Sequence, residues 1–241
     1  MSVEESIFLA RVAEQAERFE DMVEFLKPVL DTKGGDVTSD ERNLLSVAFK
    51  NLISSKRTAW RTISAIEQNP KYQKFNDSLA GYKKRIEQGL YADCENVIHI
   101  IKTKALPEGK VKDVEAKAFF TKMVGDYYRY IAETAQNEKL QQVKEEALKS
   151  YEEASKLDLP PCNPIKLGLA LNFSVFHYEV MKNQSKACTL ADEALQAALE
   201  KIDDLGEDDF RDAKSIIELL KENLTLWKEE EEGGDNQIED L

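Results

Sequence analysis

Apolar residues recur at spacings of three and four along almost the whole chain, and runs that alternate with a period of two are absent. This spacing is typical of amphipathic α-helices and not of half-buried strands. Breaks in the pattern are few and short. The sequence therefore predicts an all-α fold of about nine helices, and the short connections favour antiparallel neighbours.

Turn residues mark where the predicted helices begin and end. A helical pair precedes Gly34-Gly35, and Thr38-Ser39-Asp40-Glu41 supplies a cap followed by acidic first-turn residues. Asn69-Pro70, Leu106-Pro107 and Pro160-Pro161 end later helices, because the residue before a proline disfavours the helical conformation. The remaining predicted helices cover residues 38–69, 75–104, 114–136, 139–156, 164–182, 185–206 and 208–228.

The last residues differ from the rest of the chain. Residues 229–232 are all glutamate and are followed by two glycines and a polar end. A block of like charges with glycines is typical of disorder. No linker rich in proline, glycine or serine divides the preceding residues. We therefore expect one helical domain over residues 1–228 and a disordered acidic tail over residues 229–241.

Composition narrows the possible partners and the location. The 241 residues carry 33 basic and 46 acidic side chains, so the net charge is −13, which disfavours nucleic acids and anionic membranes as partners. Three cysteines without a metal-binding spacing suit a reducing compartment and exclude a disulfide framework. No signal peptide is visible, and the mostly apolar stretch Leu167–Phe176 is too short to cross a bilayer. We expect a soluble cytoplasmic protein without membrane insertion.

Motifs of catalysis and metal binding are missing from the sequence. Glycine-rich phosphate loops, nucleophile elbows and zinc-protease motifs do not occur. Glu95 and His99 share one helix face, but no third ligand accompanies them by spacing, and a metal site needs three or four. We expect no enzyme activity, no metal and no cofactor.

Basic residues nevertheless gather at two places in this acidic chain. Lys50 and Arg57 are seven residues apart, so they face the same way about two helical turns apart, and Arg61 follows one turn later. Arg129 stands beside Tyr130 in an aromatic stretch. An anion site is one interpretation, and solvated helix faces are the other, because exposed charges usually serve no other role.

Two apolar stripes carry asparagine at their edges. Leu171 and Val175 form one stripe beside Asn172, and Ile216 and Leu219 form the other, beside Asn223. Core packing is the usual role of such stripes. An asparagine amide at the edge of an apolar face can also hydrogen-bond an extended peptide backbone.

These segments together resemble the 14-3-3 family. The resemblance rests on RNLLSVAFKN (42–51), GDYYRYIAE (125–133), PIKLGLALNFSVF (164–176), FRDAKSIIELLKENLTLW (210–227) and the segment 12–22. It covers about residues 3–228 in order. It implies a nine-helix domain with a concave groove, which dimerises through its N-terminal helices. It also implies an adaptor without catalysis, which binds phosphoserine or phosphothreonine peptides of client proteins in signalling. A homodimer is expected, and heterodimers stay open.

The resemblance assigns roles to particular residues. The phosphate pocket is formed by Lys50, Arg57, Arg129 and Tyr130. The peptide backbone and the groove are contacted by Lys122, Asn172, Glu179, Asn223 and Trp227. The apolar groove wall is formed by Leu171, Val175, Ile216 and Leu219. The dimer interface contains Arg18, Asp21, Tyr82 and Arg85.

Two departures from the family pattern concern the dimer and the groove. Gly89 replaces an acidic residue that pairs with Arg18 across the dimer in many members, whereas Asp21 and Arg85 are still able to pair. Val124 replaces a lysine next to the groove helix, which implies a less basic surface there.

A tetratricopeptide-like scaffold is the main competing interpretation, because the segment 151–160 has that appearance. Such repeats should recur about every 34 residues. The first hundred residues instead predict two long helices. A scaffold of that kind would bind unmodified peptides.

Overall fold

The computed structural model describes residues 1–235, without the side chains of residues 204, 208, 209 and 231–235. This part of the chain contains nine α-helices and no strand, which confirms the predicted all-α fold. The helices are α1 (Val3–Gln15), α2 (Phe19–Lys33), α3 (Ser39–Glu67), α4 (Asn76–Ile100), α5 (Val114–Ala132), α6 (Asn137–Ser155), α7 (Pro164–Glu179), α8 (Gln184–Leu199) and α9 (Glu207–Asp235). Short 3₁₀ turns η1 (Pro70–Phe75) and η3 (Ile202–Asp204) and a π-helical turn η2 (Ile101–Ala105) join some of them.

Side-chain caps explain where several helices begin. Ser2 and Thr38 each accept a hydrogen bond from the backbone N–H three residues later and form capping boxes with the glutamates there. The Asp113 side chain caps α5 by accepting from the backbone N–H groups of Glu115 and Ala116, and Asn163 caps α7 just before Pro164. Each cap satisfies backbone donors that the first turn of a helix leaves unpaired.

Some helix ends differ from the prediction. Helix α5 ends at Ala132 and not at residue 136 as predicted. Asn137, at the start of α6, has a left-handed φ of 51°, so a continuous α-helix does not run through this position. Helix α4 does not continue as α-helix to residue 104 but changes to the π-helical turn η2. Helix α8 ends at Leu199, ahead of η3. Helix α9 continues to Asp235, into the segment where we predicted disorder, and residues 236–241 of that tail lie outside the described residues.

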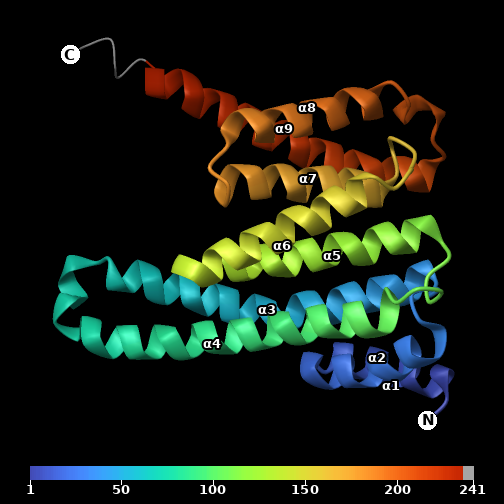
Figure 1. The fold of residues 1–241 in the computed structure, drawn as a ribbon, viewed down its shortest axis with the longest axis horizontal. Coiled ribbons are helices and arrows are strands. Elements are labelled where there is room, and N and C mark those ends of the chain that lie inside the picture. The colour runs from blue at the N-terminus through green and yellow to red at the C-terminus, as the bar shows by residue number, and fades with distance from the viewer. Residues whose placement is uncertain (236–241) are drawn as a thin grey trace.

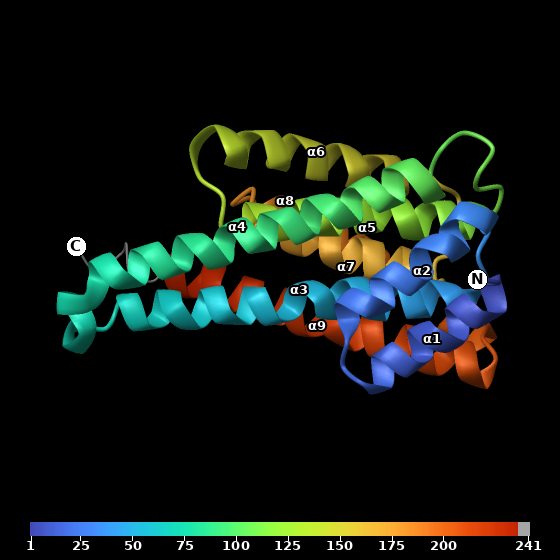
Figure 2. The same cartoon turned by 90° about the horizontal axis from the view of Figure 1, so that it is seen from below.

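Consecutive helices pack side by side as antiparallel pairs. Figure 1 views the molecule from the face on which α4 and α6 lie nearest to the viewer. Figure 2 shows that α3 and α9 lie on the side of the molecule opposite α4 and α6, with α5 and α7 between them. One buried cluster joins α1 to α5 around Phe49 and Phe120, and another joins α7, α8 and α9 around Leu220. The middle of the stack is therefore held by α5, α6 and α7.

The Gly34-Gly35 turn after α2 has a packing role. Gly34 has a φ of 62°, and a Cβ atom there would lie 2.5 Å from the carbonyl oxygen of Lys110. The Gly35 N–H donates to the same carbonyl at 2.7 Å. Glycine is required at this turn because only glycine combines a positive φ with such close approach of two backbones.

His177 lies in the last turn of α7 and is buried against the rings of Phe173 and Phe176. Burial lowers the pKa of His177, as does Lys186, while Glu152 opposes them. The imidazole is therefore favoured in its neutral form in the folded protein.

Candidate functional site: a basic groove behind α5

Helix α5 carries a line of charged residues into the middle of the molecule. Asp126 and Arg129 are buried on this helix, and Glu133 follows at its C-cap. Gly125 lies beside them, and a Cβ atom there would lie 2.9 Å from the ring of Tyr151 on α6. The glycine lets α6 approach closely enough for Tyr151 to reach the charged residues.

Glu133 brings three arginines from two helices together. Arg57 donates to it through Nε at 3.1 Å and Nη2 at 2.6 Å, a bidentate pair. Arg129 Nη1 lies 3.4 Å and Arg61 Nη2 lies 3.2 Å from its carboxylate oxygens. Each guanidinium has five N–H donors, so this carboxylate orients the arginines and leaves most of their donors unused.

Tyr130 lies among these cations. The guanidinium carbon of Arg57 is 4.0 Å from the centre of its ring, and that of Arg129 is 4.7 Å away. Burial raises the pKa of Tyr130, and Asp126 raises it further, whereas Arg129 and Arg57 lower it. The phenol therefore stays protonated at neutral pH and remains a hydrogen-bond donor.

Asp126 connects the arginine cluster to α6 and α7. Its Oδ1 accepts from Tyr151 Oη at 2.7 Å and from Asn172 Nδ2 at 2.8 Å, and its Oδ2 pairs with Lys122 at 2.7 Å. Arg129 Nε in turn donates to Tyr151 Oη at 3.3 Å. Burial lowers the pKa of Arg129, but its neighbours Tyr151, Tyr130 and Asp126 more than offset this, so the net shift is upward and the charge is kept.

A pocket opens next to this network, between α3, α5 and α7. The side chains that line it include Lys50, Lys122, Tyr130 and Asn172, with Phe119 as an apolar wall. Lys50 is exposed, and its ammonium group has no ion pair within the described part of the chain. The pocket therefore presents an unused cation, an amide and a phenol to a ligand.

The apolar residues predicted for the groove lie on α7 and α9. Leu171, Val175 and Ile216 are half-buried at the margin of the cluster that joins α7, α8 and α9. Leu219 is 47% exposed and Leu226, which sequence reasoning missed, is 55% exposed. Leu219 and Leu226 therefore present exposed apolar surface on α9.

The remaining predicted groove residues have different settings. Trp227 is buried and stacks on Tyr178, with ring centres 4.8 Å apart. Its carbonyl oxygen accepts from Gln184, and the Tyr178 hydroxyl donates to Glu230. Glu179 is exposed and Asn223 half-buried. Trp227 is thus a packing residue between α7 and α9 and exposes little surface to a ligand.

Val124 requires a correction. It is 2% exposed and lines a different pocket, with Lys102 and Lys149, on the face of α5 that turns towards α6. The expectation that it reduces the basic surface of the groove was wrong, since neighbouring positions on a helix point in different directions.

The four residues predicted for the dimer interface are on the outside of the described chain. Arg18 pairs with Asp21 at 2.9 Å on the same helix, with 64% and 46% of the two side chains exposed. The Arg85 guanidinium lies 5.0 Å from the centre of the Tyr82 ring, which is itself exposed. Phe8 and Val12 of α1 are exposed as well. Asp21 therefore has a partner within its own chain, and no pair with Arg85 forms there.

Glu133, Asp126 and Tyr151 are the central residues that sequence reasoning missed. Glu133 follows Arg129 by four residues, and Asp126 follows Lys122 by four, so spacing could have found both. Nothing in the sequence around Tyr151 indicates its contact with α5. Within the described residues, no three histidine, cysteine or carboxylate side chains converge as a metal site, and no described helix is long and apolar enough to cross a membrane.

Known proteins are similar in sequence to this chain over most of its length. The family model described as 14-3-3 protein matches residues 9–228. 14-3-3 protein 10 of Solanum lycopersicum is 43% identical over 235 residues, which cover 94% of this chain and 92% of that protein. 14-3-3 protein 3 of Entamoeba histolytica is 44% identical, with 94% and 95% covered. 14-3-3 protein zeta of Bombyx mori is 42% identical, with 97% and 98% covered. The chain belongs to the 14-3-3 family.

Proposed function

We propose that this protein is a cytoplasmic adaptor that binds phosphoserine or phosphothreonine segments of client proteins and thereby regulates them in signalling. The observation that carries the proposal is the convergence of Arg57, Arg129 and Tyr130 around Glu133. No catalytic step is part of the proposal. The three cysteines form no disulfide within the described residues, which suits the reducing cytoplasm.

Phosphate chemistry fits this cluster. A phosphomonoester brings about −1.5 to −2 charges and three acceptor oxygens. Five basic side chains, those of Lys50, Arg57, Arg61, Lys122 and Arg129, stand against the two carboxylates of Asp126 and Glu133. Arginine forks bind phosphate through paired N–H groups, and Lys50 adds a point charge. Each charge-assisted bond contributes about 1.5–3 kcal/mol, so two of them favour the phosphorylated peptide by about a hundredfold or more.

The rest of the peptide would lie along the pocket and the apolar wall. The Asn172 amide is held by Asp126 with one N–H unused, which suits a peptide carbonyl. Leu219 and Leu226 offer apolar surface for client side chains. The groove would therefore read the phosphate by charge and the flanking residues by packing.

Binding of one labelled peptide and its unphosphorylated twin tests the proposal by fluorescence anisotropy. We expect only the phosphorylated peptide to bind. Arg57→Ala and Arg129→Ala should each abolish binding, and Arg57→Lys should weaken it, because lysine keeps the charge and loses the fork. Lys156→Ala removes an exposed charge directly after α6, outside the lining of the pocket, and serves as the control. Retained affinity in Arg57→Ala, with circular dichroism unchanged, would reject the pocket assignment.

We also propose a homodimer through α1 and the α3–α4 pair, with room for heterodimers. Phe8, Val12 and Tyr82 are 64%, 47% and 45% exposed, so they offer apolar area that a second copy would bury. Arg18, Asp21 and Arg85 border them with charge. Light scattering should give twice the chain mass of 27.4 kDa at micromolar concentration. A monomer mass would contradict the proposal.

A further inference from the structure

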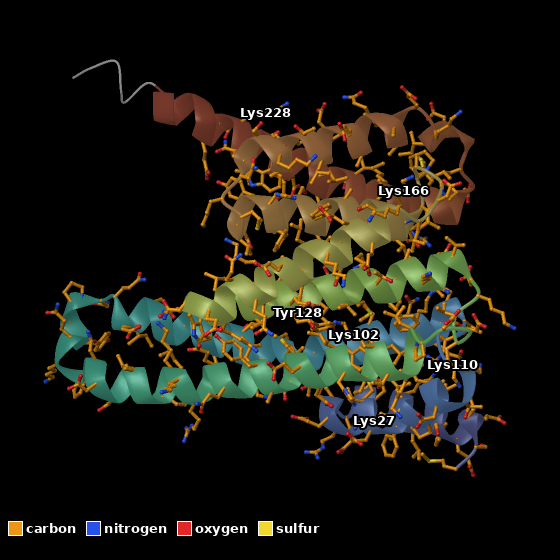
Figure 3. All side chains as sticks on the ribbon, viewed as in Figure 1. Lys27, Lys102, Lys110, Tyr128, Lys166 and Lys228 are labelled. Atoms are coloured by element: carbon orange, nitrogen blue, oxygen red, sulfur yellow. The ribbon has the colours of Figure 1, made fainter. Side chains whose placement is uncertain are left out.

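A second polar pocket lies on the face of α5 opposite the groove. It is formed by η2, α5 and α6 and faces the viewer in Figure 3, where Lys102 and Tyr128 are labelled. The side chains lining it are those of Lys102, Leu106, Lys117, Thr121, Val124, Glu146, Lys149, Ser150 and Glu153. None of them lines the pocket that contains Lys50 and Asn172.

Ammonium groups from all three elements surround this pocket. Lys117 of α5 and Lys149 of α6 are exposed, and neither ammonium has a hydrogen bond or ion pair within the described part of the chain. Lys102 binds Tyr128 Oη at 3.0 Å and Glu146 at 3.3 Å. Burial lowers the pKa of Lys102, but these two partners outweigh it and the net shift is upward. The pocket thus holds one tethered cation and two free ones.

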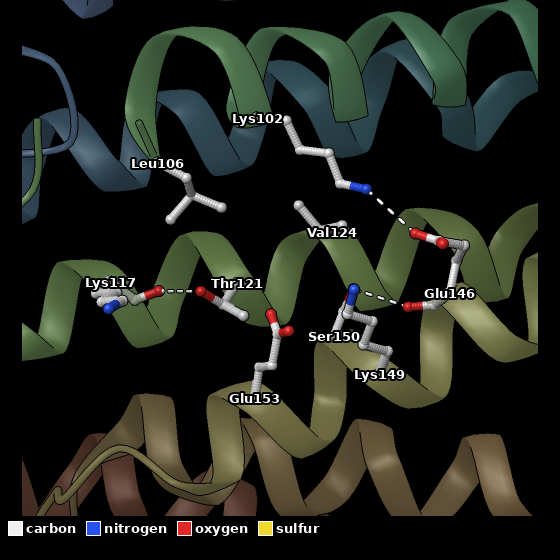
Figure 4. A pocket seen from close by; sticks show the side chains of 9 residues that line it. All are labelled: Lys102, Leu106, Lys117, Thr121, Val124, Glu146, Lys149, Ser150 and Glu153. Atoms are coloured by element: carbon white, nitrogen blue, oxygen red, sulfur yellow. Dashed lines mark hydrogen bonds and ion pairs between the residues drawn. The ribbon is translucent and has the colours of Figure 1, made fainter. Parts of the chain in front are cut away.

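Acceptor oxygens lie between the lysines. The hydroxyls of Thr121 and Ser150 each donate to a backbone carbonyl one turn earlier, at 2.7 and 2.8 Å. Their lone pairs are therefore left for a ligand. Figure 4 shows the Glu153 side chain reaching from α6 towards Thr121, and its carboxylate has no ion pair within the described residues.

The side of this pocket opposite α6 is formed by the π-helical turn η2. In η2 the Leu106 N–H donates to the Ile101 carbonyl five residues back, at 3.0 Å. Single π-helical turns of this kind are frequent at functional sites. Leu106 from this turn and Val124 from α5 provide the apolar part of the pocket.

We propose that this pocket binds a diphosphate group together with Mg²⁺. Lys117 and Lys149 would pair with phosphate oxygens. Mg²⁺ is commonly held by one or two carboxylates and the phosphates of its ligand, with waters and hydroxyl oxygens completing the shell. Glu153, with the oxygens of Thr121 and Ser150, matches that demand. A bare anion would leave Glu153 as a repulsive neighbour, whereas the magnesium complex uses Lys117, Lys149 and Glu153, the charged groups of the pocket that have no partner among the described residues, and leaves the Lys102–Glu146 pair intact.

The proposal is independent of phosphopeptide binding, and its test keeps the two sites apart. Calorimetric titrations use the full-length Arg57→Ala protein, in which the phosphate cluster of the groove is impaired. The probe is pyrophosphate, with and without Mg²⁺. ADP with Mg²⁺ forms a second arm, which distinguishes an inorganic diphosphate from one carried by a nucleotide.

Variants on α5 and α6 give the expected pattern. Lys117→Gln and Lys149→Gln should each weaken binding of magnesium pyrophosphate by about tenfold, the effect of losing one charge-assisted contact. Glu153→Gln should weaken it only when Mg²⁺ is present. Lys156→Gln, at an exposed lysine that directly follows α6 and does not line the pocket, should change nothing.

Three results would overturn the proposal. The first is no binding of magnesium pyrophosphate to the Arg57→Ala protein. The second is binding that Lys117→Gln and Lys149→Gln leave unchanged. The third is equal affinity with and without Mg²⁺ in both the parent and the Glu153→Gln variant, which would indicate a plain anion site. Weaker binding of ADP than of pyrophosphate supports an inorganic ligand, and stronger binding supports a nucleotide.

Discussion

Removal of one buried hydroxyl, in Tyr151→Phe, tests how the basic cluster is held in place. The Tyr151 ring is fully buried, and phenylalanine fills the same space. The change deletes the hydrogen bond to Asp126 at 2.7 Å and the one from Arg129 at 3.3 Å. No residue that we place in contact with the peptide is altered. Any effect on peptide binding would therefore act through the positions of Asp126 and Arg129.

The expected loss follows from these two contacts. A hydrogen bond to a charged group contributes about 1.5–3 kcal/mol, and the longer contact to Arg129 contributes less than the one to Asp126. Because the Arg129 N–H is left unsatisfied in the interior, we expect the free energy of unfolding to fall by about 2–3 kcal/mol. Phosphopeptide affinity should fall by about three- to tenfold, because Arg129 becomes less well positioned.

Urea unfolding followed by circular dichroism measures the first effect, and anisotropy measures the second. Protein concentration must be held constant, since dimerisation would make the apparent stability depend on it. Tyr128→Phe is the matched control. Tyr128 directly precedes Arg129 on α5, but among the described residues its hydroxyl accepts a hydrogen bond only from Lys102, on the other face of the helix. We therefore expect the free energy of unfolding to fall by less than about 1 kcal/mol. Equal losses in the two variants, or none in Tyr151→Phe, would refute the reasoning.

Two further predictions concern His177 and the helical glycines. The lowered pKa of His177 means that the unfolded chain binds its proton more readily, so the stability from the neutral imidazole is complete above about pH 6.5 and is lost as the pH falls through the lowered value. Urea midpoints at pH 7.5 and 5.5 should differ less in His177→Gln than in the parent, whereas exposed His99→Gln should keep the parent's difference. Gly125→Ala should destabilise by about 1–3 kcal/mol, because its Cβ would lie 2.9 Å from the Tyr151 ring. Gly168→Ala in α7, with no atom within 4 Å of the added Cβ, should stabilise the protein by about 0.5–1 kcal/mol. Thermal melts in which Gly125→Ala and Gly168→Ala shift the melting temperature in the same direction would contradict this account.

The helices themselves could be predicted from the sequence, whereas several of their ends could not. Apolar spacing marks a helix because burial of one face stabilises it wherever it packs. Helix ends depend on tertiary contacts that spacing does not report. The π-helical turn at Ile101–Ala105 and the left-handed Asn137 are of this kind, since neither has a strong turn residue before it.

The site shows the same division between local and distant contacts. The stripe of Lys50, Arg57 and Arg61 follows from helical geometry alone. The partner of Arg57 and Arg61 is Glu133, which lies 76 and 72 residues away along the chain. Asp126 and Tyr151 are likewise 25 positions apart in the sequence, so no local pattern reports their contact. The family resemblance supplied the arginines and the tyrosine of the pocket, but not the carboxylate that orients them.

That orienting carboxylate has a consequence for selectivity. Glu133 and Tyr130 already hold the guanidinium groups of Arg57 and Arg129 in the ligand-free protein, so binding costs little side-chain ordering. In exchange, Glu133 cancels part of the local positive charge, and the chain as a whole carries −13. This negative charge repels every anion, so a ligand is retained only where its contacts with the arginine forks outweigh the repulsion. A phosphate dianion with three terminal oxygens makes such contacts, whereas a glutamate, with one charge and two oxygens, gains far less from the same forks. We therefore expect the cluster to favour phosphate over carboxylate because its ordered arginine forks match the higher charge and the three oxygens of a phosphate.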